Sequence, residues 1–322
     1  MKRFLISWCF ALLAIVMVDA QQIAVVSISG VTSVFPTLAE AIEGSESGSV
    51  IYLPGGSFPI SDDVKITKKL MIIGIGHDAQ SDNVDGRTLI SGNLSYESGS
   101  DVSALIGCYV TGNVNIGTAE TPVHSVTVKY CNLNSIQVNH RDCMDTEVNQ
   151  NYIRNTSNCN YAIANFTNNI MHSLIFVGGG KICNNIFVSK YVVNGDWALP
   201  LYRINNAVIN YNVLLDHWQI HQGNDCQASD NMLIGNSWGN NCINIHVNWT
   251  DVFVNHAGIT PVSDYHFKED FKEYEDKVGL YGGTGFSDSA LPPVPYIVEK
   301  DIPEQTDASG KLNIKIKVKA GE

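Results

Sequence analysis

The chain has 322 residues and a formal net charge of −12, with 20 Lys and Arg residues against 32 Asp and Glu residues. Arginine is scarce, because after the first 20 residues the sequence contains only Arg87, Arg141, Arg154 and Arg203. Basic side chains supply most of the affinity for phosphates, so this composition argues against nucleic acid as a partner. An acidic chain also repels acidic polysaccharides unless calcium or a local basic patch intervenes.

The first 20 residues have the pattern of a secretory signal peptide. Met1-Lys2-Arg3 precedes the apolar run Phe4–Val18, and the small residue Ala20 follows at a usual cleavage position. No later run of about 20 apolar residues predicts a transmembrane helix. We therefore expect an exported protein, secreted or located in the periplasm or at the cell surface.

A short amphipathic helix is predicted next, over Pro36–Glu43. Its apolar residues Leu38, Ala41 and Ile42 fall on one face. A helix at this place would cover the open edge of the first structural unit that follows it.

One short pattern recurs between Leu105 and Leu233: an apolar residue, two residues, Asn or Cys, one residue, and another apolar residue. The Asn or Cys residues, which we call the anchors, are Cys108, Cys131, Asn151, Asn169, Asn185, Asn212 and Asn231. Their spacing of about 20 residues is too short for two helices, and the segments are rich in strand-forming residues. The pattern predicts an all-β fold, a right-handed parallel β-helix of about nine or ten coils over residues 21–260.

Each anchor residue has a mechanical role in this prediction. Asn tolerates the left-handed backbone of a sharp bend, and its amide can bond to the same amide one coil away. We therefore predict an internal ladder of Asn side chains, with Cys108 and Cys131 as compact buried substitutes.

Residues 261–322 are predicted to form a C-terminal cap or tail packed on the coils. Leu291–Pro295 has the composition of a stiff linker. Lys311–Lys319 alternates with a period of two, which predicts a half-buried strand that folds back on the coils with its Lys residues exposed.

Two parts of the chain carry a resemblance to a known fold family. Ala39–Ile42, Gly48–Phe58 and Leu70–Gly76 resemble the opening of pectate-lyase-like right-handed β-helix proteins, and Asp264–Gly283 resembles secreted β-helix proteins of Bacteroidetes. The resemblance implies the fold and not an activity. The catalytic signatures of pectate lyases and polygalacturonases are not present in the sequence.

A candidate site emerges when the coils are aligned on their anchors. The residue five positions after the anchor is Lys190, His217 and Asn236 on three successive coils. The side chains near this row that suit a sugar ring and its hydroxyls are Trp197, Asp216, Trp218, His221, Asp225 and Trp238. Our leading hypothesis is recognition of a complex extracellular carbohydrate in this region.

Two other functions and a neutral interpretation stay open. A polysaccharide lyase would use Lys190 or His217 as the base and Asp216 or Asp225 to hold a cation such as calcium. A glycoside hydrolase would need two carboxylates, Asp216 with Asp225 or Asp196. The protein could also be a structural or adhesive surface protein, and these residues could be ordinary solvated side chains.

Overall fold

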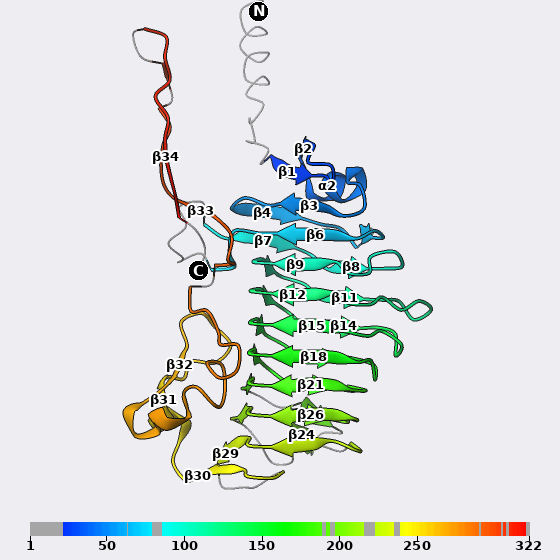
Figure 1. Ribbon diagram of the computed structural model, residues 1–322, viewed down its shortest axis with the longest axis vertical. Helices are drawn as coiled ribbons and strands as arrows, with labels where there is room; N and C mark the ends of the chain where they lie inside the picture. Colours follow the sequence, from blue (N-terminus) through cyan, green and yellow to red (C-terminus); the bar gives the residue numbers. More distant parts are fainter. Residues whose placement is uncertain are drawn as a thin grey trace, which may run out of the picture.

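The computed structural model describes residues 22–62, 64–78, 86–188, 191–193, 197–215, 223–234, 239–289, 291–303, 305–306 and 309–319. Three long sheets, almost entirely parallel, dominate the molecule and run along its length (Figure 1). Successive strands of the chain enter the three sheets in turn, so that each turn of the chain forms one coil. The arrangement is that of an all-β protein consistent with a parallel β-helix.

The first sheet has 11 strands, and its first two, β1 and β2, are antiparallel. In order they are β2 (Thr32–Phe35), β1 (Ile23–Val26), β3 (Ser49–Tyr52), β6 (Leu70–Ile73), β9 (Ala104–Ile106), β12 (Thr127–Lys129), β15 (Thr146–Asn149), β18 (Ala164–Thr167), β21 (Gly180–Cys183), β26 (Ala207–Asn210) and β28 (Gln227–Ser229).

The second sheet has 10 strands: β30 (Ile243–Ile245), β29 (Met232–Ile234), β27 (Val213–Leu214), β22 (Ile186–Phe187), β19 (Ile170–Met171), β16 (Tyr152–Ile153), β13 (Asn132–Leu133), β10 (Tyr109–Val110), β7 (Thr88–Ser91) and β4 (Gly56–Pro59). The third has seven: β25 (Leu201–Tyr202), β20 (Leu174–Ile175), β17 (Ser157–Asn158), β14 (Ile136–Val138), β11 (Val114–Ile116), β8 (Leu94–Tyr96) and β5 (Lys65–Ile66).

The main core lies between these sheets. Equivalent apolar residues of successive coils pair in register, as Leu105, Val128, Val148 and Phe166 do, and all four are fully buried. Parallel strands lie about 4.8 Å apart, so each apolar side chain packs on its equivalent in the next coil. Four cysteines, Cys108, Cys131, Cys143 and Cys159, are buried in this core.

The predicted Asn ladder is confirmed. The Asn169 side chain amide donates to Asn185 Oδ1 at 2.9 Å, and the Asn185 amide donates to Asn212 Oδ1 at 3.0 Å. The same oxygens accept the backbone N–H of the preceding anchor, as Asn185 Oδ1 does from Asn169 N at 3.0 Å. Buried backbone groups at the bends are thereby satisfied without water.

The predicted N-terminal helix is also present, as α2 (Leu38–Gly44). Thr37 caps it by accepting a hydrogen bond from Glu40 N, and Leu38, Ala41 and Ile42 are buried in the main core. The helix lies at one end of the coils, beside β1 and β2 (Figure 1).

A second, smaller core forms on the outer face of the 10-stranded sheet. The chain after β30 contributes α3 (Trp249–Val252), β31 (Phe253–Asn255), β32 (Asp264–Phe267) and the 3-10 helix η1 (Glu269–Tyr274). Phe253, Tyr265 and Phe267 pack with outward-facing residues of the sheet, including Ile170 and Val213. We call residues 249–289 the C-terminal segment.

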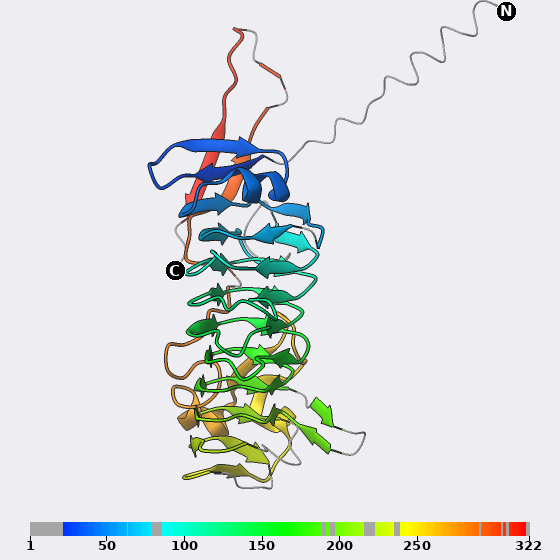
Figure 2. The ribbon, with the colours of Figure 1, turned by 90° about the vertical axis from the view of Figure 1, so that its right-hand side faces the viewer.

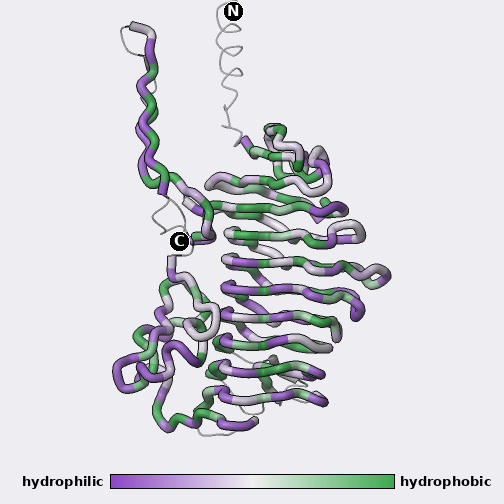
Figure 3. The backbone as a smooth tube through the Cα atoms, viewed as in Figure 1, coloured by the Kyte–Doolittle hydropathy of each residue, from purple (hydrophilic) through white to green (hydrophobic). Residues whose placement is uncertain are grey.

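The final strand pairs differently from the sequence-based expectation. β34 (Lys315–Lys319) pairs antiparallel with β33 (Tyr296–Asp301), and all five of its residues are exposed. The resulting hairpin projects past the β1 end of the coils (Figure 2), and polar and apolar residues alternate along it (Figure 3). The strand therefore folds back on β33 and not on the coils.

Candidate functional site

The outer face of the 11-stranded sheet carries two columns of polar side chains. From Cys131 onward they occupy the positions four and two residues before the anchors, except at Val208 and Cys183, and alternate with the buried residues Val128, Val148 and Phe166. We call this set the polar face: Thr127, Lys129, Glu147, Asn149, Asn165, Thr167, Lys181, Asn210, Gln227 and Ser229.

Side-chain hydrogen bonds between neighbouring coils hold the polar face in place. Asn165 Nδ2 donates to Glu147 Oε1 at 2.7 Å, and Asn149 Nδ2 donates to Thr167 Oγ1 at 2.7 Å. Lys181 and Gln227 are exposed. The set contains two Lys and one Glu, so this face is not acidic although the protein as a whole is.

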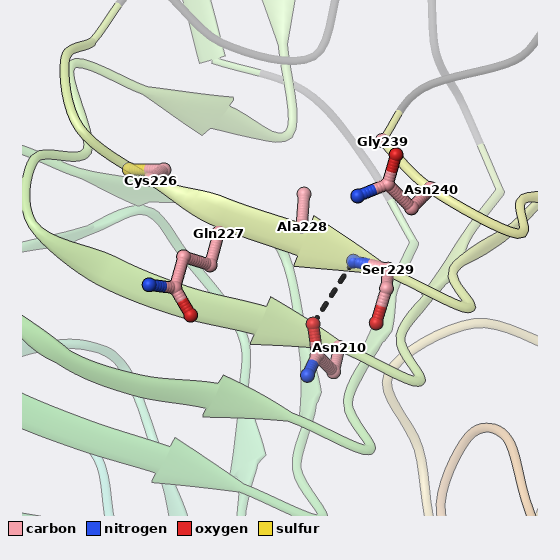
Figure 4. Close-up of a pocket in the computed structure, with 7 residues that line it drawn as sticks. All are labelled: Asn210, Cys226, Gln227, Ala228, Ser229, Gly239 and Asn240. Atoms are coloured by element: carbon pink, nitrogen blue, oxygen red, sulfur yellow. Dashed lines mark hydrogen bonds between the residues drawn. The ribbon is translucent and has the colours of Figure 1, made fainter.

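The polar face ends in a cleft of about 530 Å³, lined by Asn210, Cys226, Gln227, Ala228, Ser229, Gly239 and Asn240 (Figure 4). Asn210 Oδ1 accepts a hydrogen bond from Ser229 N at 2.9 Å, which fixes the amide across the two last strands of the sheet. The described lining residues supply amide and hydroxyl groups that both donate and accept hydrogen bonds, and none of them is charged.

One wall of the cleft depends on a glycine. Gly239 has φ +79, and a Cβ at this residue would lie 2.6 Å from the carbonyl oxygen of Ala228. Only glycine allows the chain to pass this close, which brings Asn240 N within 2.9 Å of Ala228 O.

Most of the residues proposed from the sequence lie outside the described residues. These are Lys190, Asp196, Asp216, His217, Trp218, His221 and Trp238. The backbone of Trp197 belongs to β24 (Trp197–Leu199), which pairs antiparallel with β23 (Tyr191–Val193). Asp225 is exposed, with φ 56, directly before Cys226 of the cleft.

The long coil between the anchors Asn185 and Asn212 keeps the register of the ladder. Ile182 pairs with Ile209 and Ile186 with Val213, on either side of these anchors. The extra residues form the β23–β24 hairpin, which extends outward from the coils (Figure 2). The insertion thus leaves the stacking of the polar face intact.

A group of titratable residues lies in the C-terminal segment. His266 Nδ1 is 2.8 Å from Asp264 Oδ1, and its Nε2 is 3.6 Å from Glu275 Oε1 and 3.7 Å from Asp288 Oδ2. The imidazole stacks on Tyr281, with ring centroids 3.8 Å apart. Burial raises the pKa of Tyr281, and its hydrogen bond to Asp288 raises it further.

This group has a clear structural role. Glu275 Oε2 also accepts a hydrogen bond from Phe267 N at 2.8 Å, so the cluster joins β32 to the chain after η1. The described residues contain no group of three or more His, Cys, Asp or Glu side chains arranged to hold a metal ion. No helix among them is long and apolar enough to cross a membrane.

Comparisons with protein-family models, with curated proteins and with solved structures found no match to this chain.

Proposed function

We propose that the protein is an exported right-handed parallel β-helix of the pectate-lyase-like kind and that its polar face binds an extracellular polysaccharide. The observation that carries the proposal is the row of mostly uncharged polar side chains that ends in the amide-lined cleft. Such groups hydrogen-bond sugar hydroxyls, and stacked parallel strands repeat them about every 4.8 Å along an extended chain.

The charge of the protein favours a neutral polysaccharide at this face. The net charge of −12 repels a polyanion, whereas the polar face offers two Lys, one Glu and otherwise uncharged groups.

Replacing Gln227 by Ala is expected to weaken the binding of a neutral polysaccharide to the protein about threefold to tenfold. The exposed amide lines the cleft, and one hydrogen bond contributes about 0.5–1.5 kcal/mol. A panel of neutral and acidic polysaccharides, with and without calcium, would first be screened by affinity electrophoresis. Isothermal titration calorimetry would then compare the variants.

The control is Asn244→Ala, which removes an exposed amide on the 10-stranded sheet. Equal binding by the Gln227→Ala and Asn244→Ala variants would show that the glycan does not occupy this face. Release of sugar fragments during incubation would instead identify the protein as an enzyme, and unsaturated or saturated ends would distinguish a lyase from a hydrolase.

A further inference from the structure

Two of the four arginines after residue 20 converge on one tyrosine ring of the 10-stranded sheet. The guanidinium carbon of Arg87 lies 4.4 Å from the centroid of the Tyr109 ring, and that of Arg154 lies 4.6 Å from it. Arg87 directly precedes β7, Tyr109 begins β10 and Arg154 directly follows β16. Three separate coils thus place two positive charges beside one tyrosine ring in a strongly acidic protein.

Arg154 is held in a fixed position. Its Nη1 donates to Asn132 Oδ1 at 2.7 Å and its Nη2 donates to the carbonyl oxygen of Val110 at 2.8 Å. Both acceptors are neutral, so the positive charge of the guanidinium is not balanced by them. A guanidinium has five N–H donors, which leaves further donors available for a ligand.

Neither charge is neutralised by the protein within its described part. The ion pairs there involve Lys and His side chains, and none involves Arg87 or Arg154. Burial lowers the pKa of Arg154, Tyr109 acts in the opposite direction, and the charge of Arg87 lowers it as well. The two like charges therefore repel each other, and a bound anion would offset this repulsion.

The pair remains accessible at the surface. Arg87, Tyr109 and Arg154 are all half-buried. Tyr152 of β16, in contrast, is covered by the C-terminal segment and is only 4% exposed. The fork of a guanidinium matches the two oxygens of a carboxylate, sulfate or phosphate group.

We propose that Arg87 and Arg154, braced on Tyr109 and Asn132, form a binding site for an oxyanion carried by an extracellular ligand. This site lies on a different sheet from the polar face and is independent of the function proposed for that face. Its ligand is either a free inorganic anion or a sugar that bears a carboxylate or sulfate group.

The test titrates the mature protein in low-salt buffer with sodium sulfate, glucuronate and glucose. Glucuronate differs from glucose only in carrying a carboxylate in place of a hydroxymethyl group. We expect glucuronate or sulfate to bind and glucose not to bind at this site. Affinity should fall at least tenfold in Arg87→Gln and in Arg154→Gln, and it should fall with added salt. Equal affinity for sulfate and glucuronate identifies the oxyanion alone as the ligand, whereas tighter glucuronate binding adds a contribution from the sugar.

Arg203→Gln is the matched control. Arg203 is exposed and lies 5.3 Å from the Tyr202 ring centroid and 5.9 Å from that of Phe176, without a second arginine in its described surroundings. Its removal should leave anion binding unchanged. Arg87 makes no described side-chain hydrogen bond, so Arg87→Gln is expected to fold even where Arg154→Gln does not. The proposal is overturned if neither anion binds or if the Arg87 and Arg203 variants bind equally well.

Discussion

Replacing Asn185 by Ala is expected to lower the free energy of unfolding by about 3–5 kcal/mol. The Asn185 side chain accepts hydrogen bonds from Asn169 N and Asn169 Nδ2, at 3.0 and 2.9 Å. It donates to Phe166 O, Cys183 O and Asn212 Oδ1, at 2.8, 3.1 and 3.0 Å. All of these hydrogen bonds are buried except the one to Cys183 O, which is part-buried, so alanine leaves several buried groups without a partner. Urea unfolding followed by circular dichroism would measure the loss.

Asn185→Cys is expected to cost less than Asn185→Ala, because the chain already uses cysteine in this role. Cys131 Sγ donates to Lys129 O at 3.1 Å and to Leu105 O at 3.7 Å, the carbonyls equivalent to those bonded by the Asn amides. Cysteine thus replaces the donor but not the acceptor of the ladder. The exposed Asn244→Ala variant should change stability by less than about 0.5 kcal/mol. A loss from Asn185→Ala no larger than this would refute the ladder as a source of stability.

The coils and the ladder could be predicted because their signal is local. An apolar residue, the anchor and the next apolar residue span six positions, and this unit recurs seven times. The helix α2 was predictable for the same reason, since Thr37 and the apolar face lie within one short segment. The direction in which the last strand folds has no local signal. Alternation along Lys315–Lys319 fits pairing with a coil as well as it fits pairing with β33.

The polar face was missed because of the offset chosen for the alignment. The candidate residues Lys190, His217 and Asn236 follow the anchors, where coils differ in length and the β23–β24 hairpin intervenes. Residues two and four positions before an anchor belong to the strand that leads to it, and their register is fixed by pairing. Aligning these positions would have placed Asn165, Lys181 and Gln227 on one face.

The contact between Arg87 and Tyr109 could not be predicted from the sequence either. Tyr109 and Arg154 could be related through the register of β10, β13 and β16, which the anchors define. Arg87 could not, because the ten residues between Gly76 and Arg87 do not follow the repeat and their number does not indicate where the chain rejoins the coils. Contacts between a coil and an insertion depend on the path of the insertion in space.

His77 is expected to make the protein less stable in acid. The side chain is 2% exposed and packs edge-on against Tyr152, with ring centroids 5.2 Å apart, and its Nδ1 has no partner among the described residues. Burial lowers the pKa of His77 to about 4, although the neighbouring carboxylate of Asp78 opposes the shift. The folded state therefore holds the neutral imidazole, whereas the unfolded chain binds a proton near its ordinary pKa of 6.5.

The sign and the pH range follow from these two values. The contribution of His77 to stability is complete above pH 6.5 and decreases as the pH falls to about 4, by about 3 kcal/mol in total. His77→Phe should remove this loss, so its free energy of unfolding should fall less between pH 7 and pH 4.5 than that of the wild type. Titrating carboxylates affect both proteins alike and cancel in the comparison. Replacing the exposed His246 by Phe should leave the wild-type pH dependence unchanged, and an equal acid loss in all three proteins would show that His77 does not control it.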